Sequence, residues 1–279
     1  MIKSISYWSF DGGLEATLPI KDAMLQAKKA GFEAIELCFD AKGVLSPRTT
    51  EKQCKQILAD AKEIGIKLPS LCTGMYWDTS LTDDKASVRK KAYDLTVAYI
   101  KAAKMLKAKY ILVVPGAVDV FFKPDFKKVQ YDVVWKRSVQ QMRKLANVAK
   151  KHGVTICVEN VWNKFLLSPI EMQMYLKAVG SSAVGVYFDV GNIMAYGFPQ
   201  QWIRILKKKI KRIHFKDFDC SVGTVDGFCD LLKGDVPFKE IMKAFREVGY
   251  NGSCTAEMVP PNPGIVKRTS KAMDKIFKM

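Results

Sequence analysis

The sequence contains only two histidines among its 279 residues, which excludes any metal site that needs several imidazole ligands. No apolar stretch approaches the ~20 residues that a bilayer crossing needs, so we expect no membrane-spanning segment. The seven cysteines include no Cys-x-x-Cys pair, and several lie in apolar runs, as Cys157 does. Together with a start that lacks a signal-peptide pattern, these features predict a cytoplasmic protein with reduced, buried thiols.

Acidic residues are also scarce: the sequence has 28 Asp and Glu but 45 Lys and Arg. Its formal net charge is therefore +17. The lysines are dispersed through most helical segments, and the densest stretch runs from Arg204 to Arg212. Arginines do not alternate with aromatic residues as they do on many surfaces that stack bases. The charge therefore predicts solvent-exposed helix faces rather than a nucleic-acid surface.

The pattern that is present repeats from end to end: a short apolar run, turn residues, then a stretch of helical periodicity. Amphipathic stretches include Asp22 to Ala30, Val88 to Leu106 and Trp135 to Ala149. The eight runs read as strands are Lys3 to Ser9, Ala34 to Phe39, Lys67 to Cys72, Tyr110 to Val114, Val154 to Val158, Gly185 to Phe188, Arg212 to Phe215 and Ser253 to Met258.

Near-continuous apolar strands that alternate with helices indicate a parallel sheet buried on both faces. Eight such units in 279 residues match the size of a closed (β/α)₈ TIM barrel, an α/β fold, and no linker divides residues 1–279 into domains. A doubly wound open sheet is the alternative. Its first strand–helix turn should carry a dinucleotide fingerprint, which the turn Asp11 to Gly13 lacks.

Catalytic groups of such a barrel lie where the strands end. The first four runs end in aromatic, small or turn-forming residues, whereas each of the last four ends near an ionisable side chain: Glu159, Asp189, His214 and Glu257. Buried carboxylates that face one another need a cation to remain ionised. Two Glu, one Asp and one His form an oxygen-rich site that suits Mn²⁺, Mg²⁺ or Co²⁺. Strand alternation puts Lys216 on the same side as His214.

These four strand ends resemble the xylose isomerase-like TIM-barrel superfamily, which includes ketose 3-epimerases, sugar-phosphate epimerases, hydroxypyruvate isomerase, inosose dehydratase and endonuclease IV. The residues that carry the resemblance are Val158-Glu159-Asn160, Phe188-Asp189-Val190-Gly191-Asn192, His214-Phe215-Lys216-Asp217 and Ala256-Glu257-Met258. The resemblance covers the whole chain. It implies one divalent ion, Mn²⁺ by preference, bound by Glu159, Asp189, His214 and Glu257.

Differences between this sequence and the family pattern reduce the number of family activities that we expect for it. Endonuclease IV holds three zinc ions with several histidines, whereas the second histidine here, His152, lies at the end of a predicted helix on the opposite side. Tagatose- and psicose-type epimerases carry Glu, His and Arg where this chain has Phe165, Asn192 and Cys220. The Asp-x-Gly-Asn and His-x-Lys-Asp forms look closer to pentulose-5-phosphate 3-epimerases.

The resemblance implies C3 epimerisation of a ketose or ketose phosphate, by proton transfer beside the carbonyl. Glu159 and Glu257 are our acid/base pair, and Asp189 and His214 are ligands only. Lys216 holds an oxyanion or phosphate, or pairs with Asp217 or Asp189. Further predicted substrate contacts are Asn192, Trp8, Cys72 and Trp162. The alternatives are an inosose-type dehydratase and, with less support, an endonuclease IV-like nuclease; homo-oligomerisation is left open.

Overall fold

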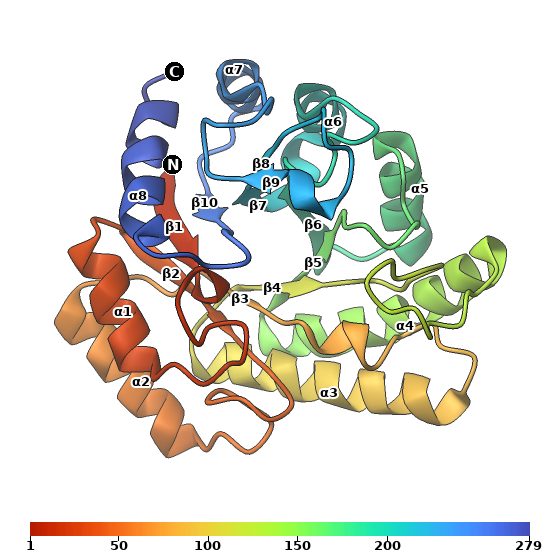
Figure 1. Ribbon diagram of the computed structural model, residues 1–279. Helices are drawn as coiled ribbons and strands as arrows, with labels where there is room; N and C mark the ends of the chain where they lie inside the picture. The colour runs from red at the N-terminus through yellow and green to blue at the C-terminus, as the bar shows by residue number, and fades with distance from the viewer.

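A computed structural model, which describes residues 1–279 throughout, shows eight parallel strands closed into a barrel (Figure 1). The strand order is β1-β10-β7-β6-β5-β4-β3-β2, so the first and last barrel strands pair, Ser4 beside Thr255. The barrel strands are β1 (Ile2–Ser6), β2 (Ala34–Cys38), β3 (Ser70–Cys72), β4 (Tyr110–Val113), β5 (Thr155–Glu159), β6 (Val184–Asp189), β7 (Ile210–Phe215) and β10 (Ser253–Ala256). The predicted TIM barrel is confirmed, and the open sheet is excluded.

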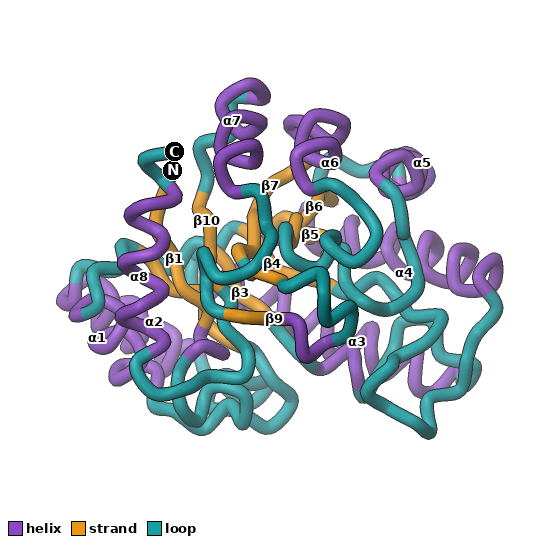
Figure 2. Tube along the Cα trace, turned by 45° about the horizontal axis from the view of Figure 1, so that its top comes forward, coloured by secondary structure: helices purple, strands orange, loops and turns teal.

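Eight helices surround the strands, and the tube in Figure 2 shows them outside the strand ring. Their bounds follow local capping signals. Thr50 and Gln53 form a capping box at the start of α2, and the left-handed Gly153 ends α4. The helices are α1 (Ile20–Lys29), α2 (Glu51–Ile64), α3 (Ala86–Met105), α4 (Tyr131–His152), α5 (Pro169–Val179), α6 (Pro199–Leu206), α7 (Phe238–Val248) and α8 (Ile265–Ile276). None of them has the length and apolar character that a membrane crossing requires.

Three strands are at least two residues shorter than the apolar runs that predict them. In the third run Pro69 has no N–H to donate, and β3 forms only from Ser70 onward. The first run ends early because the Ser6 hydroxyl accepts a hydrogen bond from Trp8 N at 3.3 Å and starts a 3₁₀ turn, Tyr7–Ser9. The last barrel strand stops at Ala256, so Glu257 lies one residue beyond it. The N–H of Glu257 donates a hydrogen bond to the Phe215 carbonyl at 3.0 Å.

A small antiparallel hairpin that the sequence analysis did not predict lies at the carboxyl end of the barrel. It pairs β8 (Asp217–Phe218) with β9 (Phe228–Cys229). The buried carboxylate of Asp217 holds it in place by accepting N–H bonds from Phe218 at 2.9 Å, Val236 at 3.1 Å and Lys233 at 3.1 Å. Asp217 is therefore a loop anchor, and it leaves Lys216 free to face the barrel axis.

The core between barrel and helices is aromatic behind β7. Phe215 packs on Phe238 and Phe245 of α7, with ring centroids 5.5 and 6.4 Å apart. Because α7 supports the strand that carries His214, its packing fixes the height of the predicted ligands.

We predict that Phe245→Ala lowers the free energy of unfolding by about 3–5 kcal/mol, because a buried phenyl ring leaves a cavity. The matched control is Phe198→Ala, which truncates a ring that is 61% exposed and should change stability by less than about 0.5 kcal/mol. Urea unfolding followed by circular dichroism measures both. Equal stability of the two variants would contradict this account of the α7 layer.

Candidate metal centre

Four strand ends bring the predicted ligands together at the carboxyl end of the barrel. Glu159 and Asp189 are the last residues of β5 and β6, His214 is the penultimate residue of β7, and Glu257 directly follows β10. One ligand atom from each side chain lies within 4.8 Å of the other three, and all four residues are buried. The parallel register explains the match in height, because Asp189 pairs with His214 across neighbouring strands.

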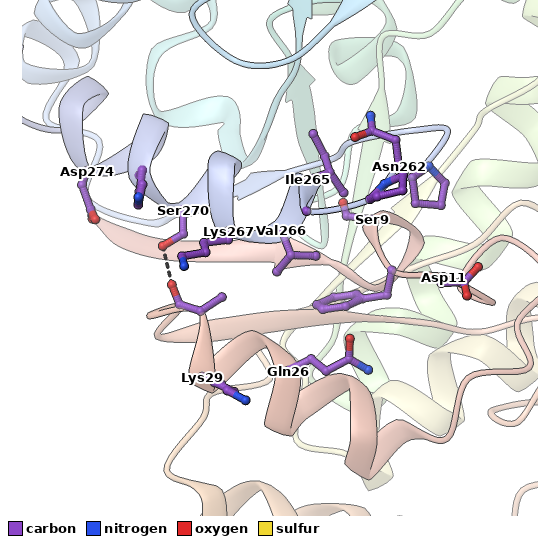
Figure 3. Close-up of a pocket in the computed structure, with 16 residues that line it drawn as sticks. Ser9, Asp11, Gln26, Lys29, Asn262, Ile265, Val266, Lys267, Ser270 and Asp274 are labelled. Atoms are coloured by element: carbon purple, nitrogen blue, oxygen red, sulfur yellow. Dashed lines mark hydrogen bonds between the residues drawn. The ribbon is translucent and has the colours of Figure 1, made fainter.

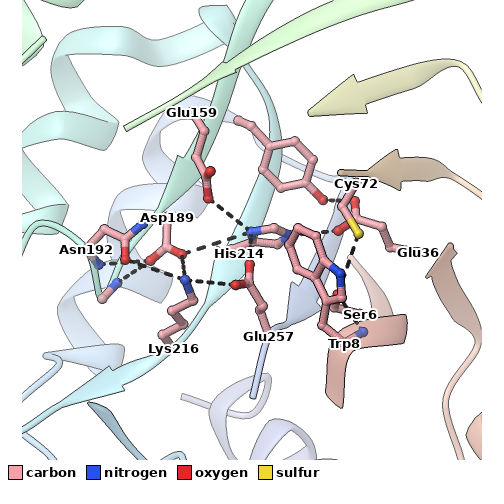
Figure 4. Close-up of polar contacts among 12 residues, drawn as sticks. Ser6, Trp8, Glu36, Cys72, Glu159, Asp189, Asn192, His214, Lys216 and Glu257 are labelled. Carbon is pink, nitrogen blue, oxygen red and sulfur yellow. Dashed lines mark hydrogen bonds and ion pairs between the residues drawn. The ribbon is translucent and has the colours of Figure 1, made fainter. Parts of the chain in front are cut away.

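The close-up in Figure 4 shows the three carboxylates converging on the imidazole of His214. His214 Nδ1 lies 2.6 Å from Glu257 Oε2, 3.4 Å from Glu159 Oε1 and 4.0 Å from Asp189 Oδ2. Despite this proximity, His214 Nδ1, Glu257 Oε2 and Asp189 Oδ2 make no hydrogen bond of acceptable geometry. Buried polar atoms without hydrogen bonds are rare in folded proteins. Lone pairs aimed at one shared point fit a cation, so the cluster can hold a divalent metal ion.

Glu36, on β2, holds the opposite nitrogen of the imidazole. Its Oε1 lies 2.7 Å from His214 Nε2, and its Oε2 accepts bonds from Ser70 at 2.6 Å and from Tyr187. With Nε2 engaged, only Nδ1 of His214 can face the cluster. A carboxylate behind a histidine is a usual way to orient a metal ligand.

Asn160 fixes the neighbouring strand end. Its side chain accepts from Asp189 N at 2.9 Å and donates to Asp189 O at 2.8 Å, a two-bond bridge between β5 and β6. Asp189 Oδ1 in turn accepts the N–H groups of Gly191 and Asn192, both at 2.9 Å. One carboxylate oxygen of Asp189 is thus committed to the backbone, which leaves Oδ2 for the centre of the cluster.

Lys216 supplies positive charge at the entrance. Its Nζ lies 2.9 Å from Glu257 Oε1 and 3.1 Å from Asp189 Oδ2. The ion pair with Asp189 is the one of the two expected pairings that forms, since Asp217 is occupied by backbone N–H groups. The Asn192 side-chain oxygen is 3.5 Å from the same ammonium.

Burial and neighbouring charges shift the pKa values of Glu159 and Glu257 in opposite directions. Burial raises the pKa of Glu159 to about 7, because desolvation outweighs the attraction of His214. Burial also opposes ionisation of Glu257, but Lys216 and His214 outweigh it and hold its pKa at about 2. The pKa of Asp189 is raised by burial. Burial disfavours the charged imidazole, yet Glu257 and Glu36 raise the pKa of His214 well above its ordinary value.

The remaining predicted contacts lie around this centre at different depths. Trp8 is half-buried beside it and donates from Nε1 to Cys38 Sγ at 3.1 Å, and Trp162 Nε1 donates to the Asn192 carbonyl at 2.8 Å. Cys72 is fully buried, with its sulfur 3.8 Å from Ser6 Oγ, and it lies on β3 below the entrance. Burial raises the pKa of its thiol well above the ordinary value.

Two of the positions that depart from the psicose type lie outside the centre. Phe165 is buried between Tyr131 and Tyr175, with ring centroids at 5.4 and 6.0 Å, and Cys220 is exposed. His152 ends α4 next to Gly153, before β5 begins, and so lies at the opposite end of the barrel.

A larger groove lies elsewhere on the molecule. It has a volume of about 820 Å³ and lies between α1 and α8, outside the barrel (Figure 3). Two of its polar side chains are already paired: Ser270 Oγ donates to the Ala30 carbonyl at 2.5 Å, and Asp274 binds Lys3 at 2.5 Å. A smaller cavity of about 190 Å³ is lined by Lys216, Glu257 and Phe228 and opens at the predicted centre.

Sequence reasoning missed Glu36, Asn160 and Tyr187 as functional residues. Glu36 did carry a signal, since it is the one charged residue of an otherwise apolar strand, and such a residue usually has a buried partner. No sequence pattern indicated that this partner is His214, 178 positions away.

Comparisons with known proteins find relatives that are named as sugar epimerases and solved structures with the same fold. A provisionally named L-ribulose-5-phosphate 3-epimerase of Escherichia coli K12 is 24% identical over 89% of this chain and 87% of its own length. Fructoselysine 3-epimerase of Escherichia coli O157:H7 is 23% identical over 87% and 86%. The crystal structure of D-psicose 3-epimerase with D-tagatose, from Clostridium cellulolyticum H10, superposes with a TM-score of 0.81 at 21% identity, covering 99% of this chain and 98% of that one.

These relatives are therefore named as sugar epimerases. At 21% identity, the structural match to D-psicose 3-epimerase shows a shared fold only. A family model described as xylose isomerase-like TIM barrel matches residues 24–276. The chain belongs to the xylose isomerase-like TIM-barrel family.

Proposed function

We propose that this protein is a divalent-metal-dependent 3-epimerase of a ketose or ketose phosphate. The observation that carries the proposal is the buried Glu159, Asp189, His214 and Glu257 cluster, in which one ligand atom from each side chain lies within 4.8 Å of the other three. Mn²⁺ is the ion we propose, because three carboxylates and one imidazole form a hard, mostly oxygen ligand set. The names of the relatives, which act at C3 of a ketose, support the same reaction.

The four residues would hold the ion, which when bound supplies a Lewis acid for the oxygens next to the exchanging carbon. Glu159 and Glu257 come from strands on different sides of the cluster, separated by β6 and β7 in the barrel order. Two carboxylates that approach a substrate carbon from different strands suit a reaction in which one takes a proton and the other returns it.

The two glutamates stand in different charge environments. In the metal-free cluster, burial raises the pKa of Glu159 to about 7, whereas Lys216 and His214 hold Glu257 ionised. Glu159 is thus the more readily protonated of the two, which suits it to return a proton to the carbon from which Glu257 takes one. Lys216, beside Glu257, would keep that carboxylate charged and would face the substrate oxygens.

We predict that Glu159→Gln and His214→Asn each lose most of the bound Mn²⁺ after dialysis, because each removes one of four ligands. The control is Glu240→Gln, which changes an exposed glutamate on α7 and should retain the wild-type metal content. Atomic emission spectroscopy gives the ratio of metal to protein. Wild-type Mn²⁺ content in both ligand variants would refute the assigned site.

We predict that Glu36→Gln raises the Kd for Mn²⁺ by about 10- to 100-fold, because His214 loses the carboxylate that orients it. Tyr187→Phe removes only one donor to Glu36 and should have a smaller effect. Calorimetric titration with Mn²⁺ measures both, with circular dichroism as the check on folding. A correctly folded Glu36→Gln protein with unchanged affinity would show that Glu36 does not position the ligand.

We predict that the Mn²⁺-loaded protein in D₂O exchanges the C3 hydrogen of at least one ketose or ketose phosphate and forms its C3 epimer. Proton NMR of a substrate panel follows the lost C3 signal. Glu257→Gln should abolish the exchange, because it removes both the proposed base on one face and one of the four proposed metal ligands. Loss of water from a cyclic polyol ketone, with no exchange at C3, would instead identify the dehydratase alternative.

A further inference from the structure

A row of aromatic side chains borders the entrance above the metal centre, and the reaction just proposed does not use most of it. Its members come from five different loops or turns and are called here the aromatic rim: Trp8, Trp77, Phe122, Phe121, Trp162 and Phe228. Two of them extend into solvent, since Phe121 is 46% exposed and Phe122 is 48% exposed. Large apolar side chains grouped on a surface mark binding sites more often than chance placement does.

The rings form a chain of direct contacts. Trp77 touches Phe122 with ring centroids 5.2 Å apart, and Phe122 touches Phe121 at 5.1 Å. Phe121 meets Trp162 at 5.7 Å, and Trp162 meets Phe228 at 5.4 Å. Most of these contacts are edge-on, which leaves ring faces of the exposed members available to a ligand.

One end of the chain of rings reaches the metal centre. Phe228 lines the 190 Å³ cavity together with Glu257, and its ring lies 5.4 Å from Lys216 Nζ. At the other end, a Cβ placed on Gly74 would lie 3.7 Å from Trp77 Cδ1 and 4.0 Å from Trp8 Cζ2, so these two indoles flank one glycine. The rim is therefore continuous with the proposed catalytic pocket through Phe228.

Three of the cations near the rim are already paired with carboxylates. Lys123 is paired with Asp78, Lys164 is paired with Asp119 at 3.0 Å, and Lys216 is engaged by Asp189 and Glu257. A phosphate at any of these three would compete with a carboxylate, and only Lys85 and Lys127, on the groove beside Trp77 and Phe122, form no ion pair. A sugar or aryl ring needs only the apolar ring faces that are already exposed.

We infer that the substrate is a ketose whose far end carries a ring, a second sugar or an aryl group, and that the aromatic rim binds this ring. The inference rests on the proposed function, since it assumes that the carbonyl end of the sugar lies at the metal centre. The C–H bonds on one face of a pyranose ring present partial positive charge to the negative face of an aromatic ring. The rim residues thus select the substrate by its substituent, and the metal cluster acts on its ketose end.

The test compares three sugars that differ only at O6: fructose, fructose 6-phosphate and isomaltulose, which carries a glucosyl group there. Calorimetric titration of the wild-type protein, with Mn²⁺ present, should give isomaltulose a Kd about tenfold below that of fructose 6-phosphate. The double variant Phe121→Ala/Phe122→Ala should lose most of this preference. Phe198→Ala, an exposed phenylalanine that contacts none of the rim rings, should retain it.

Tightest binding of fructose 6-phosphate, or an unchanged preference in the double variant, would overturn the inference. Light scattering adds a second check: if the double variant changes only the oligomeric mass, the rim is a protein interface and the inference fails. The readout is binding, so it is separate from turnover. Preferential binding of isomaltulose without C3 exchange would sustain the rim as a binding site and refute the epimerase proposal.

Discussion

The structure depends on the balance of charge at the carboxyl end of the barrel. Three carboxylates and one imidazole are buried within 4.8 Å of one another, and Glu36 adds a fourth carboxylate directly behind the imidazole. Charges removed from water are costly unless they are paired. Lys216, which is paired with Asp189 and Glu257, offsets part of this cost, and a bound divalent ion would offset more of it.

The rest of the barrel serves to keep that cluster in register. The parallel strands bring their ends to one height, and hydrogen bonds between neighbouring ends then fix each side chain. Asn160 ties Asp189 to β5, and Ser70 and Tyr187 hold Glu36 against His214. Each tie joins different strands, so the precision of the site comes from closure of the barrel rather than from any one segment.

The proposed chemistry and the proposed specificity lie in different layers of the molecule. The four residues of the candidate metal centre lie on or next to strand ends, while the aromatic rim lies mostly on the loops and turns that follow β1, β3, β4, β5 and β7. A barrel with this division can retain its reaction while its loops change the substrate. The relatives fit this picture, because their printed names share a 3-epimerase activity but differ in the sugar.

The sequence by itself determined the repeat of strand and helix, and with it the barrel, because hydrophobic periodicity is a local property. It also located the four residues of the buried cluster that could hold a metal ion, since an ionisable residue at the end of an apolar strand is visible in one segment. Only the tertiary structure decided the rest: Glu36 meets His214 across 178 positions, and the rim joins rings from five loops or turns. Loop conformation and pairings across the barrel depend on closure and packing, which no single stretch of sequence encodes.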